Sequence, residues 1–290
     1  MGKKITGVVL LLNSTKKEGN QLAQEVAEIC MALGVELTVF ESLAKVSSED
    51  IANVLEVSCG KNPLIIVGGG DGSLLRAARI CYGFRACLLG VNLGSLGFLS
   101  SLRKEEVCEH LGKILKGHYK ISKRNALNVE LWKNQQCCSK SWALNEAVIS
   151  RGQHSHMIKV CVEIDGVLMT EYHCDGLIVS TATGSTAYSL SAGGPIVSPK
   201  AKAIIITPIC PHALSNRPVV VDASEKVRIY LPAKNPGMIL QVDGLEIQKM
   251  RPGDAVHLGV AECPIELLQL SDASFYEILR QKLRWSGTNV

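Results

Sequence analysis

The sequence predicts an α/β domain, then an all-β domain, then a helix that returns to the α/β domain. In residues 1–122, apolar strand-like runs alternate with amphipathic helical segments, an order typical of a parallel sheet covered by helices. In residues 123–265, short strand-like segments follow one another with turn residues between them, which is typical of a β sandwich. Residues 266–290 form a tail with a helical pattern, and we expect its apolar stripe to pack on the first domain.

Helical and strand periods identify the elements of the first domain. Leu22, Val26 and Leu33 recur at helical spacing before Gly34, and glycine often ends a helix. Residues 64–67 are apolar throughout, as expected for a strand that is covered on both faces. We expect strands at 5–12, 35–40, 64–67 and 86–91, and helices at 19–33, 48–57, 73–82 and 104–116.

Alternation of apolar and polar residues identifies the strands of the second domain. Residues 158–164 alternate and run into Asp165-Gly166, a dipeptide typical of tight hairpins. We expect no helix between about residues 125 and 262. In the tail, Ser274 and Glu277 predict a capping box at the start of a helix over 274–285. The expected strands are 126–132, 142–150, 158–164, 167–172, 177–180, 219–221, 227–231, 238–242 and 255–260.

Composition excludes several classes of protein. The chain has 31 basic and 27 acidic residues and a net charge of +4, without a basic run, so we expect no nucleic-acid partner. No apolar stretch approaches the roughly 20 residues of a membrane helix, so we expect no membrane partner. The 11 cysteines are odd in number, form no C-x-x-C pair and lie mostly in apolar segments. We therefore expect a cytoplasmic protein.

A glycine-rich turn at residues 68–72 is the first candidate site. It follows the apolar strand at 64–67 and opens a helix, so its backbone N–H groups and the positive helix end favour phosphate. The turn is neither a dinucleotide fingerprint nor a P-loop. Asp71 is the unusual member, because phosphates repel a bare carboxylate. It needs a bridging metal ion, a proton to accept, or a structural role, of which helix N-cap is the obvious one.

Three further stretches carry polar groups that an ordinary core would not. Residues 92–98 form a second glycine-bearing loop, and the strand ends of an open α/β sheet place it at the same edge as the first. Asn145-Glu146 interrupts an apolar segment, and adjacent strand residues face opposite sides, so either one of the two is buried with a partner or the pair lies at a strand end. Residues 180–191 carry seven Ser and Thr hydroxyls among small residues and no Lys, Arg or Glu, which favours a hydroxyl-lined site.

With Gly69-Gly70-Asp71-Gly72, then Asn145-Glu146, then Thr-Ala-Tyr-Ser-Leu-Ser-Ala-Gly-Gly at 186–194, the chain resembles the NAD kinase family. Residues 92–98 and 207–212 are similar to further family segments, and the resemblance extends over about residues 5–285. Gly-Gly-Asp-Gly by itself is also found in diacylglycerol-type lipid kinases, which supply the alternative hypothesis. A non-catalytic NAD-binding regulator is a third alternative, and it would not need Asp71.

The resemblance implies that ATP donates its γ-phosphoryl group to the 2′-hydroxyl of the adenosine ribose of NAD, which yields NADP. It also implies a divalent cation, Mg²⁺, whose ligands the sequence does not identify, and a homo-oligomer, dimer or tetramer. Asp71 would be the catalytic acid/base. The residues implied in nucleotide binding are Gly69, Gly70, Asp71, Gly72, Arg76, Asn145, Glu146, His156, His173, Asp175, Thr186, Ala187, Tyr188, Ser189, Leu190 and Ser191.

Overall fold

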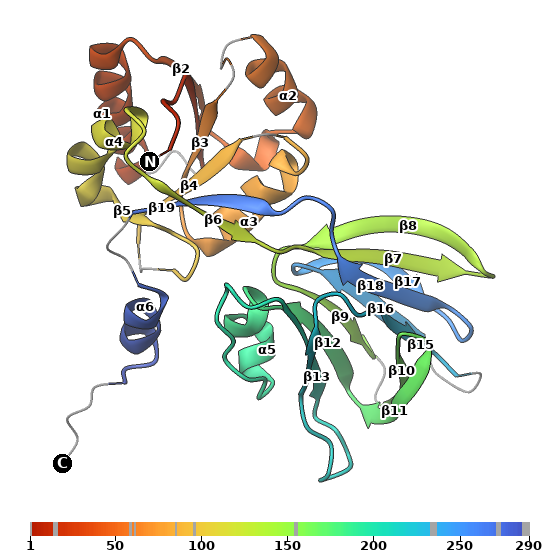
Figure 1. Cartoon of the computed structure of the whole chain (residues 1–290). Coiled ribbons are helices and arrows are strands. Elements are labelled where there is room, and N and C mark those ends of the chain that lie inside the picture. Colours follow the sequence, from red (N-terminus) through yellow and green to blue (C-terminus); the bar gives the residue numbers. More distant parts are fainter. Residues whose placement is uncertain are drawn as a thin grey trace, which may run out of the picture. The chain divides into compact units, whose positions relative to one another are not determined.

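The computed structural model describes residues 2–13, 17–57, 60, 62–84, 86–94, 97–153, 156–232, 237–270 and 274–285. The chain divides into two compact units, the first formed by residues 1–123 with 265–290 and the second by 124–264. Figure 1 shows the elements of both units.

The first unit is a parallel α/β sheet with helices on both faces. Its strand order is β2-β1-β3-β4-β19-β6, and β5 pairs with β4. Helices α1 and α4 cover one face and α2 and α3 the other (Figure 1). The strands are β1 (Gly7–Leu12), β2 (Glu36–Phe40), β3 (Pro63–Gly68), β4 (Cys87–Asn92), β5 (Leu102–Arg103), β6 (Lys120–Arg124) and β19 (Ile265–Gln269). The helices are α1 (Lys17–Leu33), η1 (Leu43–Lys45), α2 (Ser48–Val57), α3 (Asp71–Cys81), η2 (Lys104–Glu106), α4 (Val107–Leu115) and α6 (Phe275–Lys282).

Apolar side chains from strands and helices make the core of this unit. Val8 and Leu10 of β1 are fully buried and share a cluster with Leu22 of α1 and Leu111 of α4. All six residues of β3 and of β4 are buried, as predicted from their unbroken apolar runs. The four strands and four helices predicted in residues 5–116 are therefore confirmed, with shifts at their ends.

The second unit is a β sandwich. One sheet has the order β11-β10-β15-β18-β7-β8 and the other β14-β13-β12-β9-β16-β17. Inward-facing residues of both sheets, such as Val160 and Val179, belong to one apolar cluster, so the core lies between the sheets. The strands are β7 (Leu127–Lys133), β8 (Gln136–Ala143), β9 (Glu146–Ser150), β10 (Ile158–Ile164), β11 (Val167–Cys174), β12 (Gly176–Thr181), β13 (Ala203–Ile209), β14 (Val219–Asp222), β15 (Val227–Tyr230), β16 (Met238–Val242), β17 (Leu245–Met250) and β18 (Ala255–Val260).

Several expectations for this unit need correction. The strand predicted over 142–150 is two strands, because the chain passes from one sheet to the other at residues 144–145. Strands β8, β13 and β17 were not predicted as such. A short helical stretch, η3 (Gly184–Thr186) with α5 (Tyr188–Ser191), stands where no helix was expected. Each of these two elements is about one turn long, which is too short for helical periodicity to reveal it.

The tail returns to the first unit. β19 pairs in parallel with β4, with Leu267 opposite Leu88. Helix α6 begins with the predicted capping box, since Ser274 accepts from the Tyr276 N–H at 3.3 Å and Glu277 accepts from the Ser274 N–H at 3.2 Å. Its Phe275 ring lies 6.4 Å from the ring of Phe98, between ring centroids.

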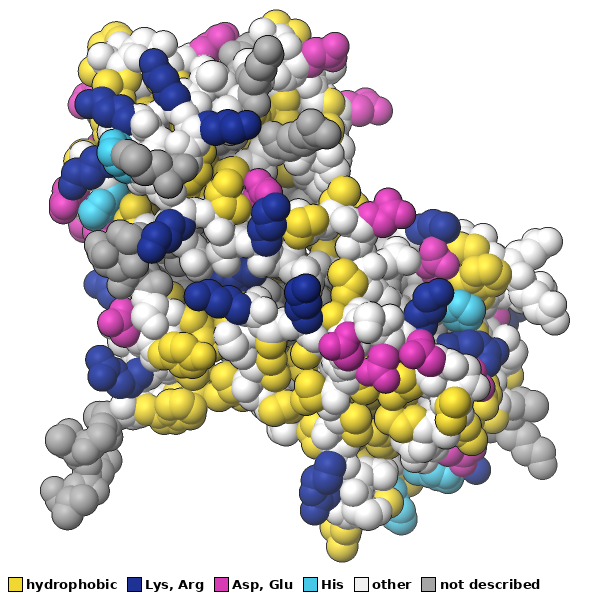
Figure 2. Space-filling view, viewed as in Figure 1, with side chains coloured by type: hydrophobic (Ala, Val, Ile, Leu, Met, Phe, Trp, Pro, Cys, Tyr) yellow, Lys and Arg dark blue, Asp and Glu magenta, His cyan; other side chains and the backbone are white. Residues whose placement is uncertain are grey.

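The surface carries charges of both signs. Lys and Arg side chains and Asp and Glu side chains are both spread over the visible face (Figure 2), in line with the small net charge. Among the described residues, no helix is long and apolar enough to cross a membrane.

Candidate active site

Asp71 is the first residue of α3, and its carboxylate is bound by a second loop of the same unit. β3 ends at Gly68, and Gly70 is the residue at which the helix is capped. The Asp71 Oδ2 accepts a hydrogen bond from the Phe98 N–H at 2.8 Å, and its Oδ1 accepts one from the Leu99 N–H at 3.2 Å. Asp71 is therefore not the N-cap of the helix, and that interpretation of the carboxylate is wrong.

These two hydrogen bonds connect the two glycine loops. β3 and β4 are neighbouring parallel strands, so the loops that follow them leave the sheet at the same edge, as predicted. The bonds fix the orientation of the Asp71 carboxylate. An ionised carboxylate has about four acceptor positions, so this one retains capacity for a ligand.

The glycines of the first loop are of two kinds. A Cβ at Gly68 or Gly69 would clash with neighbouring side chains, so packing requires these two. A Cβ at Gly70 or Gly72 would find no heavy atom within 4 Å. Packing therefore does not require Gly70 and Gly72, and their backbone is open to close approach by a ligand such as phosphate.

Arg76 lies one turn further along α3 and has a structural role. Its Nε donates to the carbonyl oxygen of Leu43 at 3.0 Å, and its Nη2 donates to that of Ala44 at 2.7 Å. The guanidinium thereby ties α3 to η1, while a contact between Arg76 and NAD stays a prediction.

Asn145 and Glu146 lie at the junction of β8 and β9, so the strand-end alternative for this pair is confirmed. Both are buried, with 8% and 7% of their surface exposed. The carboxylate of Asp243 binds the backbone of this junction. It accepts from the N–H groups of Leu144 at 2.8 Å, Asn145 at 2.9 Å and Glu146 at 3.1 Å.

The carboxyl group of Glu146 is in an environment that disfavours its charge. Burial, together with the nearby Asp243, raises the pKa of Glu146 to about 7, against an opposing hydrogen bond from the Tyr188 backbone N–H. Glu146 Oε2 and the Oγ of Ser180 are buried and have no hydrogen-bond partner among the described residues. Ser180 is the residue opposite Glu146 in the β12–β9 pairing, so the two polar side chains share one face of the sheet.

The hydroxyl-rich segment folds against this junction. At the end of β12, Thr181 donates its N–H to the carbonyl oxygen of Asn145 at 2.8 Å. Further on, Ser189 Oγ lies 3.0 Å from Thr207 Oγ1 of the neighbouring strand β13. Since the Tyr188 N–H also bonds to the Glu146 carboxyl, the second unit brings Asn145 and Glu146 together with residues 186–191. Ser189 is buried, Thr186, Ala187 and Leu190 are half-buried, and Tyr188 and Ser191 are exposed.

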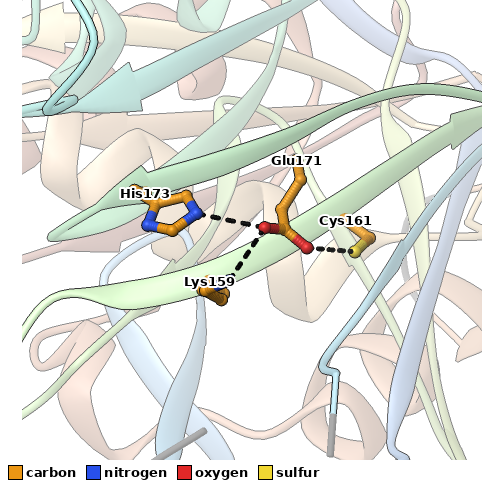
Figure 3. A network of polar contacts seen from close by, with 4 residues as sticks. All are labelled: Lys159, Cys161, Glu171 and His173. Atoms are coloured by element: carbon orange, nitrogen blue, oxygen red, sulfur yellow. Dashed lines mark hydrogen bonds and ion pairs between the residues drawn. The ribbon is translucent and has the colours of Figure 1, made fainter. Parts of the chain in front are cut away.

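The two predicted histidines are surface residues. His156 is exposed in the loop before β10. His173 lies on β11, and its Nε2 is 3.0 Å from Glu171 Oε1, which also binds Lys159 Nζ at 3.2 Å (Figure 3). Hydrogen bonds from Lys159 and His173 lower the pKa of Glu171. Among the described residues, no group of three or more His, Cys, Asp or Glu side chains could hold a metal ion.

Asp175 lies at the other end of β12. Its Oδ1 is 2.9 Å from the Nε of Arg151, and its backbone oxygen accepts from the Arg151 N–H at 3.1 Å. Six residue steps separate Asp175 from Thr181, which is about 20 Å along an extended strand. Asp175 and the junction at 145–146 are therefore at different ends of the sheet.

Four residues that bind these sites were not singled out from the sequence, although Phe98 lies in the predicted second glycine loop. Asp243, Arg151 and the amides of Phe98 and Leu99 each bind a predicted site residue. The turn Asp243-Gly244 is recognisable, since Asp-Gly is typical of a two-residue hairpin. The residues that Asp243 binds are 97 to 99 positions away, so no local pattern reveals them.

Comparison with known proteins gives one consistent result. Models of the ATP-NAD kinase N-terminal domain and the ATP-NAD kinase C-terminal domain match residues 8–119 and 144–270. NAD kinase of Geotalea daltonii is 38% identical over 264 residues, covering 91% of this chain and 93% of that protein. NAD kinase of Geobacter sulfurreducens is 42% identical over 223 residues, covering 77% of this chain and 78% of its own.

Solved structures share the fold. Yeast NADH kinase complexed with NADH is 25% identical with a TM-score of 0.78. The match covers 100% of this chain and 89% of the yeast chain. An NAD kinase from Archaeoglobus fulgidus in complex with ATP is 24% identical with a TM-score of 0.74. The match covers 97% of this chain and 99% of the Archaeoglobus chain. The comparisons do not favour the lipid kinase alternative. Since the sequence matches extend over most of both the chain and its relatives, this chain belongs to the NAD kinase family, a family of phosphotransferases.

Proposed function

We propose that the protein transfers the γ-phosphoryl group of ATP to the 2′-hydroxyl of the adenosine ribose of NAD, with Asp71 accepting the hydroxyl proton. The ribose oxygen forms a bond to the γ-phosphorus, the bond to the β,γ-bridging oxygen breaks, and ADP leaves. The proton of the hydroxyl passes to the Asp71 carboxylate. The observation that carries this proposal is the Asp71 carboxylate itself, held by two backbone N–H groups beside glycines that packing does not require.

The timing of the proton transfer follows from the chemistry of the two groups. A carboxylate is too weak a base to remove a sugar hydroxyl proton before the reaction begins. In a loose phosphoryl-transfer transition state the hydroxyl becomes acidic as its oxygen bonds to phosphorus, so a positioned carboxylate accepts the proton late. Such help is worth roughly 10²- to 10⁴-fold in rate.

A divalent cation fits this arrangement. Mg²⁺ bound with a nucleotide takes most of its ligands from phosphate oxygens and water and needs only one or two protein carboxylates. Asp71 is the carboxylate that the glycine loop presents. When bound, the cation supplies neutralisation of the charge on the transferring phosphoryl group.

The second unit supplies the acceptor site in this proposal. The yeast relative is an NADH kinase complexed with NADH, and the Archaeoglobus relative is an NAD kinase in complex with ATP, which supports both substrates. Asn145 and Glu146 can hydrogen-bond ribose hydroxyls or adenine nitrogens, and the 45% exposed Tyr188 ring offers an aromatic surface. His156, His173 and Asp175 are proposed to contact NAD on the basis of the family resemblance.

We also propose a cytoplasmic homo-oligomer, dimer or tetramer. The family resemblance supports the oligomer. Cys30, Cys81 and Cys87 are buried, and burial raises their pKa values, so they pack as small unreactive apolar side chains. That behaviour supports a reducing compartment.

The test is the variant Asp71→Asn, assayed for NADP formation with ATP, Mg²⁺ and NAD. Asn keeps the size of the side chain and one acceptor oxygen for the second loop but cannot take the proton. We expect normal folding and a loss of at least about 10² in kcat. Asp50→Asn is the matched control, since Asp50 is also a helix first-turn carboxylate that accepts a backbone N–H. Full activity in Asp71→Asn would overturn the assignment, and phosphorylation of diacylglycerol in preference to NAD would overturn the reaction.

A further inference from the structure

The turn between β16 and β17 carries a carboxylate that binds a distant part of the chain. Asp243 and Gly244 are its two central residues, with φ values of 46° and 79°. Positive φ at both positions defines a tight hairpin turn in which Asp-Gly and Asn-Gly are favoured. The turn alone therefore accounts for an Asp at position 243, but it does not account for what the Asp243 side chain contacts.

Hydrogen bonds run both from the 144–146 junction to Asp243 and from Asp243 to the junction. The carboxylate accepts from three consecutive backbone N–H groups, those of Leu144, Asn145 and Glu146, at 2.8 to 3.1 Å. The Asp243 N–H donates in return to the Glu146 carbonyl oxygen at 3.0 Å. Three successive N–H groups can converge on one carboxylate only if the backbone between them bends. The carboxylate therefore stabilises the bend through which the chain passes from β8 to β9.

The bend decides where two proposed acceptor-binding side chains point. Successive residues of an extended strand face opposite sides, and Asn145 and Glu146 are the last residue of the bend and the first of β9. Rotation of either peptide would carry the Asn145 amide and the Glu146 carboxyl to new positions. The Glu146 Oε2 is buried and has no hydrogen-bond partner within the described part of the chain, so it keeps an unused acceptor position for a ligand.

We propose that Asp243 is a positioning residue of the acceptor site, whose carboxylate holds the 144–146 backbone so that Asn145 and Glu146 are aligned to bind NAD. The inference rests on the proposed function in that NAD is the ligand. Asp243 itself does not need to touch the substrate. Misplacement of binding groups by about 1 Å is enough to cost a large factor in catalysis or affinity, so loss of this carboxylate should weaken NAD binding.

The chain contains a matched control for this carboxylate. Asp165 and Gly166 form the same kind of turn between β10 and β11, with φ values of 48° and 81°. The Asp165 Oδ1 also accepts a hydrogen bond from a backbone N–H far along the chain, that of Lys226 just before β15, at 2.9 Å. Asp165 thus has the same turn chemistry and a similar remote hydrogen bond, but it does not contact Asn145 or Glu146.

The experiment compares Asp243→Asn with Asp165→Asn. Asn-Gly is as favourable as Asp-Gly in this turn, so both variants keep the hairpin, and each loses a negative charge and one acceptor oxygen. For Asp243→Asn we expect the KM for NAD to rise about tenfold or more and the KM for ATP to stay within about twofold. For Asp165→Asn we expect both constants to stay within about twofold. Asp243→Ala should extend the NAD defect, provided that its circular dichroism is native.

Two measurements without turnover complete the test. Calorimetry with NAD alone should show weaker binding for Asp243→Asn and unchanged binding for Asp165→Asn. Hydrogen exchange should be faster at the amides of 144–146 only in Asp243→Asn. The proposal is overturned if both variants bind NAD as the wild type does, or if the Asp243→Asn defect is equal for ATP and NAD. If the wild type binds NAD but does not phosphorylate it, the proposed reaction fails while the calorimetry still decides the role of Asp243.

Discussion

Gly97 lies against Asp71 so closely that a Cβ at position 97 would overlap the Asp71 carboxylate. The neighbouring Phe98 and Leu99 supply the N–H groups that bind this carboxylate. The second glycine loop therefore encloses Asp71 with backbone alone, and any side chain at 97 must displace either the loop or the carboxylate.

Gly97→Ala should lower kcat for NAD phosphorylation by about 10-fold or more, because the displaced carboxylate no longer meets the ribose hydroxyl. Steady-state kinetics with varied NAD and ATP measure this loss. Gly94→Ala is the control in the same loop, since a Cβ there would meet no heavy atom within 4 Å and the Gly94 N–H could still donate to Asn92. Equal activities of the two variants would show that Asp71 is not held in this way.

Glu146→Gln should change stability in a pH-dependent manner. The pKa of Glu146 is raised from 4.5 to about 7, so between these values the folded state keeps a proton that the unfolded state releases. The free energy of unfolding of the wild type therefore falls as pH rises through this window and stays lower above it. Gln behaves as the protonated form at every pH. We expect the variant to have the higher Tm at pH 8, by the equivalent of up to about 3 kcal/mol, and the two proteins to converge near pH 4.

The control for this experiment is a carboxyl group whose pKa is lowered in the folded state, so the expected change in Tm has the opposite sign. A hydrogen bond from Lys140 lowers the pKa of Glu130, so ionised Glu130 favours the folded state and its contribution is lost as pH falls through the lowered pKa. Glu130→Gln should therefore lower the Tm at pH 8. Thermal unfolding from pH 4 to 9 measures both variants. A Glu146→Gln curve parallel to that of the wild type would contradict the raised pKa.

Asp175→Ala should raise the KM for NAD about tenfold or more and leave the KM for ATP within about twofold, because lost hydrogen bonds to charged groups are costly. Arg151→Gln separates substrate contact from the local ion pair. It removes the Arg151 partner at 2.9 Å but keeps the carboxylate, so its effect on the KM for NAD should be smaller. Equal effects of the two variants would assign the role to the ion pair, and a defect confined to ATP would remove Asp175 from the NAD site.

Local sequence patterns predict most of the fold because the period of apolar residues reports which face is covered. β3 and β4 are buried on both faces, and their unbroken apolar runs identify them. β8 is different, since it is an edge strand whose residues, from Gln136 to Trp142, are exposed or half-buried. Without a buried face it has no apolar period, so its sequence resembles that of a loop.

The candidate sites divide in the same way. Asp71 is recognisable from the sequence because the strand, the glycine turn and the helix around it are consecutive in the chain. The hydrogen bonds that orient Asp71 come from residues 27 and 28 positions away, and those that orient Asn145 come from 98 positions away. Such contacts depend on which strands become neighbours in the sheet, and no local period contains that information.

The position of β19 between β4 and β6 in the first sheet imposes an order on folding. Strand β4 must wait for β19, and the side chains of Cys87 and Glu266, which meet across these strands, are 179 residues apart in the chain. While the ribosome makes the intervening residues, the part of the β4 edge that β5 does not cover stays open, and open edges pair readily with other chains. The sheet of the first unit is thus complete only after β19 emerges, so protection of that nascent edge is a requirement that the native structure no longer displays.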